Sequence, residues 1–471
     1  MFTALPPQLI QSLQGATGFD QQAFENVHAN PEQVTSVRAN PAKISAQQFA
    51  AHSFMGTNNL PVSSTLVPWC AAGHYLSQRP SFTFDPWLHA GAYYVQEASS
   101  MFLHHALQAI YKTEAAPATV LDLCAAPGGK STLLASALPN SFIVSNEVIK
   151  NRVTILAENI SKWGSDNVVV THNDPRDFAR LPGFFDCMVV DAPCSGSGLF
   201  RKDPKAINEW SEDNVTHCSL RQQRILANVL PALKTGGHLL YSTCSYSPAE
   251  DEAICDWLIQ QFGLESVPLP TQPTWGIVET FSKKKQAAGY RFYPDKVKGE
   301  GFFIACFVQT AEVETAAINS KYSLTKLSKT DAAIVEPWLT DASLLSIYKQ
   351  KETIIAFPQK WLGYFMIVQQ FLHTRKSGVA IGVIKGSGLV PHHELALSQL
   401  VSKQLQAVEL DYDNAIKYLR RSDLLLQESY TGWTLACYQH LAVGWMKLLG
   451  NRINNYYPTE WRILKPYLSG C

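Results

Sequence analysis

The sequence predicts an α/β fold with a mainly parallel, doubly wound sheet that ends in an antiparallel pair of strands. Three observations indicate this fold. From about residue 118, short β-rich runs alternate with longer amphipathic runs, which is typical of βαβ units. The first β-rich run leads into a Gly-rich turn, CAAPGGK, that opens a helical run. The chain has 471 residues, enough for about three domains, so further modules are expected beside this sheet.

The predicted elements of the sheet domain follow one another without long gaps. Helices are expected over 131–138, 150–162 and 216–233, and from Pro248 to Phe262, where Pro and three acids suit a helix amino terminus. RFYPD and EGFFIACFV, between 291 and 308, predict a closing hairpin. The five β-rich runs are ATVLDL at 118–123, SFIVSNE at 141–147, NVVVTHND at 167–174, FDCMVVDAP at 185–193 and GGHLLYSTCS at 236–245.

Changes in pattern divide the chain into four segments. Residues 1–110 are rich in aromatics and Pro and show no pattern that predicts their fold. Beyond about residue 312, a short α/β stretch gives way to Gly-punctuated β-like runs, which indicate a compact β module. The predicted segments are an extension at 1–110, the sheet domain at 111–312, a small α/β linker domain at 313–385 and a β module at 386–471.

Composition and charge indicate an ordinary folded protein with a slightly basic carboxyl-terminal part. Hydrophobic residues make up 46% of the chain and charged residues 17%, which excludes a disordered chain or a disulfide scaffold. Up to residue 300 there are 22 basic and 26 acidic residues, and beyond it 17 and 13. A contact with a polyanion is therefore expected in the second part.

The cysteines and the apolar runs indicate a cytoplasmic protein with reduced thiols. No stretch of about 18 uncharged apolar residues predicts a membrane span, and the amino terminus does not resemble a secretory signal. The ten cysteines include no C-x-x-C pair and no Cys/His set at zinc spacing. We therefore expect a soluble, cytoplasmic protein without a metal site.

Residues suited to chemistry follow the ends of all five predicted strands. Because ligands bind at the carboxyl ends of the strands in an open α/β sheet, these residues are expected to meet at one edge. They are the loop Cys124, Ala125, Ala126, Pro127, Gly128, Gly129 and Lys130, then Glu147, Asp174, Asp191 with Pro193 and Cys194, and Thr243 with Cys244.

The Gly-rich loop is compatible with three kinds of ligand to different degrees. A phosphate-binding loop of an NTPase needs Gly where this chain has Cys124, and the dinucleotide pattern G-x-G-x-x-G is absent. Fewer glycines, followed about 20 residues later by an acid for ribose hydroxyls, suit an adenosine ligand without a pyrophosphate. S-adenosyl-L-methionine is such a ligand, and Glu147 is the acid.

The two thiols at neighbouring strand ends narrow the chemistry to methylation of a pyrimidine carbon. Carbon 5 of cytosine becomes nucleophilic when a cysteine thiolate adds to carbon 6, and an acid near ring nitrogen 3 stabilises the adduct. Cys194 and Cys244 supply the thiols, and Asp191 is placed for the acid role. The spacing alone leaves open which of the two cysteines is the nucleophile.

The motifs DLCAAPGGKS, VVDAPCSGSGLFRKDP, YSTCS and EGFFIACF, with Glu147 and Asp174, resemble the RNA cytosine-5 methyltransferases of the NOL1/NOP2/Sun type over about residues 90–310. The resemblance implies a class I methyltransferase fold with a Rossmann-like mixed sheet. It implies that Cys244 is the nucleophile and that Cys194 assists product release. It places the cofactor at residues 124–130, Glu147, Asp174 near the adenine, and Asp191 between cofactor and base. It also implies that Arg201, Lys202 and Asp203 lie near the RNA backbone.

The two ends of the chain resemble the bacterial members of this family that act on the small ribosomal subunit. YYVQEASSM at 93–101 carries this resemblance, and GWMKLLGNRINNYYP at 444–458 is similar to the end of a PUA-type RNA-binding module. The resemblance implies methylation of one cytosine of 16S rRNA, cytosine 1407, with 16S rRNA in the small subunit as partner. The oligomeric state is left open.

Four alternatives remain on the sequence. The same catalytic motifs serve enzymes that act on tRNA. An exocyclic amino-methyltransferase commonly has [DN]-P-P-[YF] after the fourth strand, where this chain has Asp191-Ala192-Pro193-Cys194. The chain could also be a catalytically silent RNA-binding factor in ribosome assembly, although it retains all the expected site residues. A thiol-disulfide role for the two cysteines would leave the adenosine site without a use.

Overall fold

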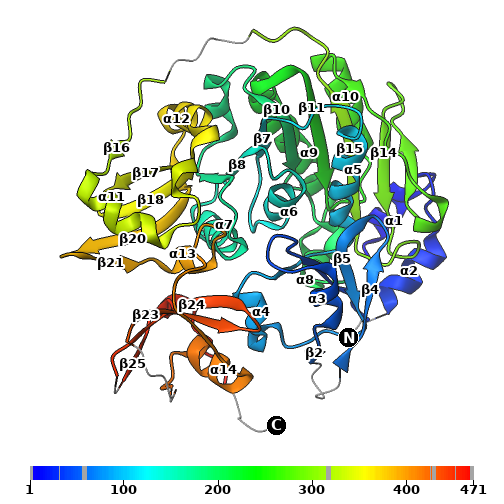
Figure 1. Cartoon of the computed structure of the whole chain (residues 1–471). Helices are drawn as coiled ribbons and strands as arrows, with labels where there is room; N and C mark the ends of the chain where they lie inside the picture. Colours follow the sequence, from blue (N-terminus) through cyan, green and yellow to red (C-terminus); the bar gives the residue numbers. More distant parts are fainter. Residues whose placement is uncertain are drawn as a thin grey trace.

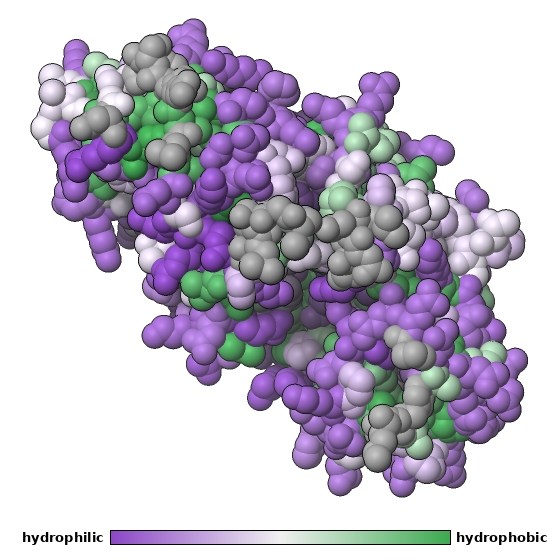
Figure 2. Space-filling model, turned by 90° about the horizontal axis from the view of Figure 1, so that it is seen from below, coloured by the Kyte–Doolittle hydropathy of each residue, from purple (hydrophilic) through white to green (hydrophobic). Residues whose placement is uncertain are grey.

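The computed structural model describes residues 4–30, 32–55, 61–314, 320–424, 426, 431–450 and 452–466. Figure 1 shows a large central sheet with the blue amino-terminal elements and the red carboxyl-terminal sheet below it and a yellow five-stranded sheet to its left. None of the described helices is long and apolar enough to cross a bilayer. On the face shown in Figure 2, hydrophilic residues predominate and hydrophobic residues form small separate patches.

The central sheet confirms the predicted α/β fold. Its strand order is β13-β14-β15-β11-β10-β7-β8-β9-β19, and β12 also pairs with β15. The five predicted strands are parallel neighbours, and β15 runs antiparallel to β11. The strands are β7 (Thr119–Asp122), β8 (Phe142–Asn146), β9 (Val168–Thr171), β10 (Phe185–Asp191), β11 (Leu233–Thr243), β12 (Glu265–Ser266), β13 (Val278–Phe281), β14 (Ala288–Phe292), β15 (Phe302–Val308) and β19 (Thr374–Ser377).

Alternating side chains of the strands fill a separate hydrophobic core on each face of the sheet. On β7, Val120 packs into one core with α5, α6 and α7, whereas Leu121 packs into the other with α9, α10 and α12. Buried strands of this kind read as continuous hydrophobic runs, which is why they could be predicted. The helices are α5 (Phe102–Ile110), α6 (Gly129–Ala137), α7 (Lys150–Trp163), α9 (Glu212–Val229), α10 (Glu252–Phe262) and α12 (Leu362–Phe371).

The predicted limits of two helices, 216–233 and 248–262, are wrong. The helix α9 begins at Glu212 because Ser211 caps it, accepting a hydrogen bond from the Asn214 N–H, and it ends before Pro231. The helix α10 begins at Glu252 and not at Pro248. The residues between Pro248 and Glu252 form a turn whose acidic side chains contact other loops.

The amino-terminal segment, whose fold the sequence did not predict, forms a small sheet of order β4-β5-β1-β6 with short helices around it. A separate hairpin joins β2 and β3. The elements are α1 (Pro7–Leu13), α2 (Gln21–Ala29), β1 (Thr35–Ala39), α3 (Ala46–Ala51), β2 (Phe54–Met55), β3 (Pro61–Val62), β4 (Ser64–Val67), β5 (Cys70–Leu76), α4 (Pro86–His89) and β6 (Tyr93–Val95), followed later by the short α8 (Lys205–Glu209) of the sheet domain.

Beyond residue 320 the described chain forms two further sheets, of orders β16-β17-β18-β20-β21 and β22-β23-β24-β25. The strand β19 leaves this region and pairs with β9 at the edge of the central sheet. The elements are β16 (Thr325–Lys326), α11 (Lys329–Val335), β17 (Leu345–Gln350), β18 (Thr353–Pro358), β20 (Val379–Lys385), β21 (Gly388–Pro391), α13 (His393–Leu397), β22 (Ala407–Glu409), α14 (Tyr412–Arg420), β23 (Gly432–Tyr438), β24 (Leu441–Leu448) and β25 (Ile453–Asn455).

Candidate active site

The loops that follow the five parallel strands meet at one edge of the central sheet. Backbone hydrogen bonds join the start of a loop to a neighbouring strand: the Leu123 N–H donates to the Val189 carbonyl of β10 at 3.0 Å and the Ala125 N–H to the Asn146 carbonyl of β8 at 2.8 Å. The Ala192 N–H donates to the Ser242 carbonyl at 2.8 Å. The residues predicted from the strand ends are therefore brought to a common edge.

The Gly-rich loop is a tight turn that leads directly into α6. Gly128 has a φ of +115°, which other residues rarely adopt, and a Cβ there would lie 3.2 Å from the Leu156 side chain. From α7, the Arg152 guanidinium donates to the Ala126 carbonyl at 2.6 Å, and the Asn159 amide donates to the Pro127 carbonyl at 2.8 Å. The loop is thus held in place by two side chains of α7, and its small residues leave room for a ligand.

Glu147 offers a buried carboxylate oxygen beside this loop. Its Oε1 accepts a hydrogen bond from the Ile149 N–H at 2.9 Å. Its Oε2 has no hydrogen-bond partner among the described residues and lies 3.4 Å from the Arg152 guanidinium. A buried acceptor without a donor is suited to the hydroxyls of a ribose. This residue fits the predicted cofactor.

Asp122, at the end of β7, is a second buried carboxylate near the loop. Its Oδ2 accepts a hydrogen bond from the Ser131 hydroxyl at 2.6 Å, and its Oδ1 has no partner among the described residues. Burial raises the pKa of Asp122 to about 7. The sequence pattern did not single out this residue, although it lies only two positions before Cys124, where the Gly-rich loop begins.

Asp174 lies at the start of the short helical turn Pro175–Arg180 and caps it. Its Oδ1 accepts a hydrogen bond from the Arg176 N–H at 3.1 Å. The side chain is 46% exposed, so its carboxylate also faces solvent at the sheet edge. A contact with adenine remains a prediction for this residue.

Asn146, which the sequence reasoning missed, connects three of these loops. Its buried amide donates to the carbonyls of Leu123 and Asn173, at 3.2 and 3.0 Å, and its Oδ1 accepts from the Thr171 hydroxyl and the Asn173 N–H. A polar residue at the end of an apolar strand, directly before Glu147, is the signal that could have indicated it.

The sulfur atoms of Cys194 and Cys244 lie 3.0 Å apart, within hydrogen-bonding distance. Both side chains are partly buried. The hydrogen bond with Cys244 and then burial raise the pKa of Cys194 well above its ordinary value. The two thiols therefore form one hydrogen-bonded pair at this edge of the sheet.

Lys130 and Asp191 form an ion pair beside the two thiols. The Lys130 ammonium lies 2.8 Å from Asp191 Oδ2, and the Ser242 hydroxyl donates to Asp191 Oδ1 at 2.8 Å. The ammonium also lies 5.1 Å from the centre of the Phe302 ring. Lys130 thus extends from the first turn of α6 to the carboxyl end of β10.

The expected RNA contact of Arg201 is not supported. Its side chain is only 6% exposed and lies 3.6 Å from Glu300 Oε1, in a buried ion pair. The guanidinium also donates to the backbone carbonyls of Glu32 and Gly299. Lys202 and Asp203 are exposed. A motif shows charge but not burial, which is why this basic residue was misinterpreted.

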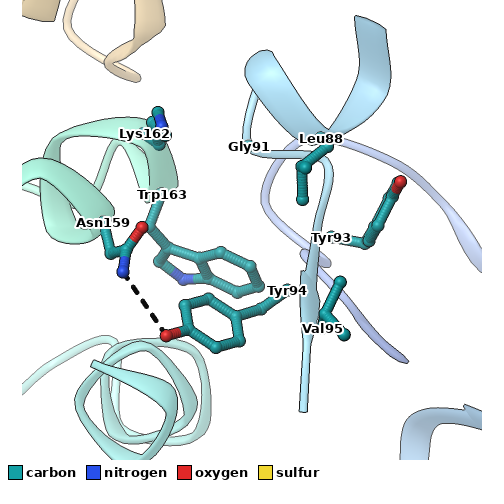
Figure 3. Close-up of a pocket in the computed structure, with 8 residues that line it drawn as sticks. All are labelled: Leu88, Gly91, Tyr93, Tyr94, Val95, Asn159, Lys162 and Trp163. Carbon is teal, nitrogen blue, oxygen red and sulfur yellow. Dashed lines mark hydrogen bonds between the residues drawn. The ribbon is translucent and has the colours of Figure 1, made fainter. Parts of the chain in front are cut away.

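An apolar pocket of about 230 Å³ lies behind the Gly-rich loop, between β6 and α7. Figure 3 shows Tyr94 and Trp163 pointing toward each other from these two elements, with Asn159 within 3.5 Å of the Tyr94 hydroxyl. The two cysteines do not line it, so it is separate from the thiol pair.

Among the described residues, no group of three His, Cys, Asp or Glu side chains could hold a metal ion, and the nine described cysteines are free thiols. Cys471 lies outside the described residues, as does Asn451 of the carboxyl-terminal motif.

Family models match three parts of the chain. Residues 111–308 match 16S rRNA methyltransferase RsmB/F, residues 5–98 match the N-terminal domain of 16S rRNA methyltransferase RsmF, and residues 405–463 match the methyltransferase RsmF PUA domain. The predicted residue limits of the four segments remain predictions. The matches identify the carboxyl-terminal sheet as a PUA domain.

Similar proteins extend along nearly the whole chain. Ribosomal RNA small subunit methyltransferase F of Aeromonas salmonicida (strain A449) is 32% identical over 443 residues, which is 90% of each chain. The protein of the same name from Aliivibrio fischeri (strain ATCC 700601 / ES114) is 30% identical over 441 residues, also 90% of each chain.

Two solved structures share the fold of the central part. A methyltransferase homolog protein from Pyrococcus horikoshii is 28% identical with a TM-score of 0.51, over 65% of this chain and 100% of that one. PH0851 is 25% identical with a TM-score of 0.57, over 64% of this chain and 66% of that one. Together with the paired thiols and the adenosine-type loop, these matches show that the chain belongs to the ribosomal RNA small subunit methyltransferase F family.

Proposed function

We propose that this rRNA methyltransferase transfers a methyl group to carbon 5 of a cytosine in 16S rRNA through a covalent cysteine adduct. The observation that carries the proposal is the 3.0 Å contact between Cys194 and Cys244 at the edge where Glu147 and the Gly-rich loop also lie. Methylation of an exocyclic amine or a ribose hydroxyl has no use for two thiols, whereas carbon 5 of cytosine needs at least one.

The methyl donor is S-adenosyl-L-methionine, which supplies an electrophilic methyl group when bound. In our proposal the loop 124–130 and Glu147 hold it, the loop through its small residues and backbone and Glu147 through the ribose hydroxyls. Asp174 is proposed to contact the adenine from the next loop. Together these residues orient the methyl group toward the edge where the two thiols lie.

Cys244 is the proposed nucleophile. Its thiolate would form a bond to carbon 6 of the base, and the electron pair of the 5,6 double bond would then form the bond from carbon 5 to the methyl group. The bond between that methyl group and the sulfonium sulfur would break at the same time, with S-adenosyl-L-homocysteine as the leaving group. The proton on carbon 5 then leaves to water, the bond between sulfur and carbon 6 breaks, and the thiolate and the aromatic ring are restored. The assignment of this role to Cys244 follows the resemblance of the YSTCS motif to that of the RNA cytosine-5 methyltransferases.

Asp191 and Lys130 are proposed to stabilise the adduct as an ion pair. The Asp191 carboxylate is an acceptor for the exocyclic amine of cytosine, and the Lys130 ammonium is a donor for ring nitrogen 3. In this arrangement the proton for ring nitrogen 3 comes from Lys130, and Asp191, which the sequence placed for the acid role, is proposed to orient the base by accepting a hydrogen bond from its exocyclic amine. Cys194 is proposed to assist release of the methylated base.

For the substrate we propose cytosine 1407 of 16S rRNA within the small ribosomal subunit, in the cytoplasm. The support is the match to the 16S rRNA methyltransferases over the sheet domain and to the PUA domain at 405–463. In structured RNA the base must leave the helical stack to reach Cys244, which costs a few kcal/mol. The flanking domains are suited to supply binding energy for this step.

The test is transfer of labelled methyl from S-adenosyl-L-methionine to small subunits that lack the modification, to free 16S rRNA and to bulk tRNA, with identification of the labelled nucleoside. Label in 5-methylcytosine from subunits is the expected result. Label in tRNA would retain the mechanism and change the substrate, and label in another nucleoside would contradict the proposal. Cofactor binding without any transfer would favour a silent RNA-binding factor.

A further inference from the structure

Glu250, which no part of the proposed mechanism uses, is a fully buried carboxylate between the two cysteine-bearing turns. Its side chain is 0% exposed. Its Oε1 accepts a hydrogen bond from the Ser195 N–H at 2.8 Å. Its Oε2 accepts from the hydroxyls of Ser195 and Ser245, at 2.5 and 2.6 Å. One carboxylate thus bonds to the residue that follows each cysteine.

Hydrogen bonds also hold the backbone of Glu250 in place. The Tyr241 hydroxyl donates to its carbonyl at 2.6 Å, and its N–H donates to the Ser247 carbonyl at 2.9 Å. Gln222 of α9 donates to Glu250 Oε1 at 3.4 Å and to the Pro193 carbonyl at 3.1 Å, so it links the acid to the residue before Cys194. The carboxylate therefore has little freedom to move away from the turns.

We propose that Glu250 is a positioning residue that holds the turns of Cys194 and Cys244 in register and so keeps the two sulfur atoms in contact. This role rests on the proposed covalent mechanism, in which both thiols act on the same base. Without the carboxylate, two serine hydroxyls and one backbone N–H would lose their acceptor. The turns are also joined directly, by the Gly198 N–H to the Cys244 carbonyl at 2.8 Å and the Tyr246 N–H to the Ser197 hydroxyl at 2.9 Å. Among the described residues, Glu250 is the carboxylate that accepts hydrogen bonds from both turns.

The neighbouring acids show what a purely structural carboxylate does here. Glu252 is ion-paired with Arg291 at 2.5 Å and accepts from the Thr280 hydroxyl at 2.8 Å. Glu252 makes no hydrogen bond with Ser195 or Ser245, although it lies only two residues from Glu250. Glu252 is therefore a matched control for the loss of a buried acid that does not hold the thiols.

The charge of Glu250 also acts on the thiol pair. After the hydrogen bond and burial, the negative charges of Cys244 and Glu250 contribute to the raised pKa of Cys194, and the Gly196 N–H opposes them. A substitution that removes the charge is therefore expected to lower the pKa of this thiol. Such a change can be measured without any RNA substrate.

The experiment uses the full chain and its Glu250→Gln, Glu250→Ala and Glu252→Gln variants. The first readout is the rate at which diamide, which takes up two hydrogen atoms, joins Cys194 and Cys244 in a disulfide, measured by mass spectrometry. The second is kcat and KM for methyl transfer. The third is the pH dependence of iodoacetamide alkylation at Cys194, and the melting temperature reports folding.

We expect Glu250→Ala to slow disulfide formation and to lower kcat about ten- to a hundredfold, as a displacement of about 1 Å can do, while KM for the cofactor stays near the wild-type value. Glu250→Gln, which retains an acceptor for the Ser195 N–H, should recover part of the loss and shift alkylation of Cys194 to lower pH. Glu252→Gln should lower the melting temperature but leave the disulfide rate unchanged.

Two outcomes would overturn the positioning role: folded Glu250 variants with the wild-type disulfide rate and kcat, or a loss in Glu252→Gln of the same size. Because disulfide formation and alkylation need no RNA, they remain informative if the wild type transfers no methyl group. Failure of the proposed function and failure of this inference can thus be distinguished.

Discussion

The sulfur atoms of Cys194 and Cys244 lie 3.0 Å apart although 50 positions separate the two residues in the chain. The distance follows from topology: β10 and β11 are parallel neighbours with Asp191 opposite Ser242, so the turns after them leave the sheet side by side. Neighbouring thiols at the edge where the cofactor loop lies can act one after the other on the same carbon atom.

This contact predicts different results for the two alanine variants. Cys244→Ala should abolish methyl transfer because the adduct cannot form. Cys194→Ala should permit the adduct but slow its resolution, so a covalent complex of protein and RNA should accumulate on a denaturing gel. Cys218→Ala, a buried thiol on α9, is a control that should show neither effect. Activity in Cys244→Ala would contradict the assigned roles.

Much of the site could be predicted because strand ends are visible in the sequence. The five β-rich runs are buried on both faces, so they read as strands, and the residues after them had to share an edge. Cys194, Cys244, Glu147 and Asp191 were found in this way. The amino-terminal sheet was not predicted, because its strands are only three to seven residues long and are separated by segments rich in Pro and aromatics.

The residues that were missed act through contacts that a local pattern does not show. Glu250 stands in the run AEDE, which is typical of a helix amino terminus, and only the fold brings it to Ser195, 55 positions away. Arg201 was misinterpreted for the same reason, because its partner Glu300 is remote in sequence. The polar strand β19 gave no strand signal, since it lies at the sheet edge.

Gly198 permits a close approach of three backbone segments, and Gly198→Ala should disrupt it. A Cβ at this position would lie 2.5 Å from the Gly301 carbonyl oxygen and 2.7 Å from that of Cys244. The turn that carries Cys244 would have to shift, at a cost of about 1–3 kcal/mol in stability. We expect a lower melting temperature and a lower kcat for methyl transfer. Gly363→Ala, on α12 with open space around it, is a control that should retain both; equal effects of the two substitutions would contradict the crowding argument.

Lys130→Met removes the ammonium group of Lys130 but keeps a hydrophobic side chain, so it tests the contribution of the charge alone. That side chain would still pack, but Asp191 would lose its ion pair and ring nitrogen 3 its proposed proton donor. Loss of a positioned acid typically lowers the rate 10²- to 10⁴-fold, so we expect a decrease of about that size in kcat. Single-turnover methyl transfer measures it, with the exposed Lys112→Met as a control. If Lys130→Met changed only the affinity for the cofactor and not kcat, Lys130 would bind the cofactor without donating a proton.

Asn173 connects the loop of Asp174 to β19, and Asn173→Ala should weaken cofactor binding. Its side chain accepts from the His373 N–H at 2.9 Å and donates to the His373 carbonyl at 3.2 Å. Loss of about 1 kcal/mol of net hydrogen bonding corresponds to about a fivefold weaker affinity. Equilibrium binding of S-adenosyl-L-methionine measures this effect. Asn140→Ala, remote from the loop after β9, should leave affinity unchanged. If Asn173→Ala also left the affinity for S-adenosyl-L-methionine unchanged, the position of Asp174 would not depend on the hydrogen bonds between Asn173 and His373.

Glu300 predicts a pH-dependent stability that Glu300→Gln should remove. Burial raises its pKa from 4.5 to about 7, although Arg201 opposes the shift. The folded protein therefore keeps a proton that the unfolded chain has already lost, so this contribution is full below about pH 4.5 and is lost as the pH rises through about 7. Between pH 5 and 8 the wild type should lose roughly 2–3 kcal/mol of stability relative to Glu300→Gln, whose side chain is neutral throughout. Thermal unfolding of both proteins across this range measures the difference, with the exposed Glu265→Gln as a control. A constant difference between wild type and Glu300→Gln would mean that Glu300 is ionised at both ends of the range, and that Arg201 outweighs burial in this ion pair.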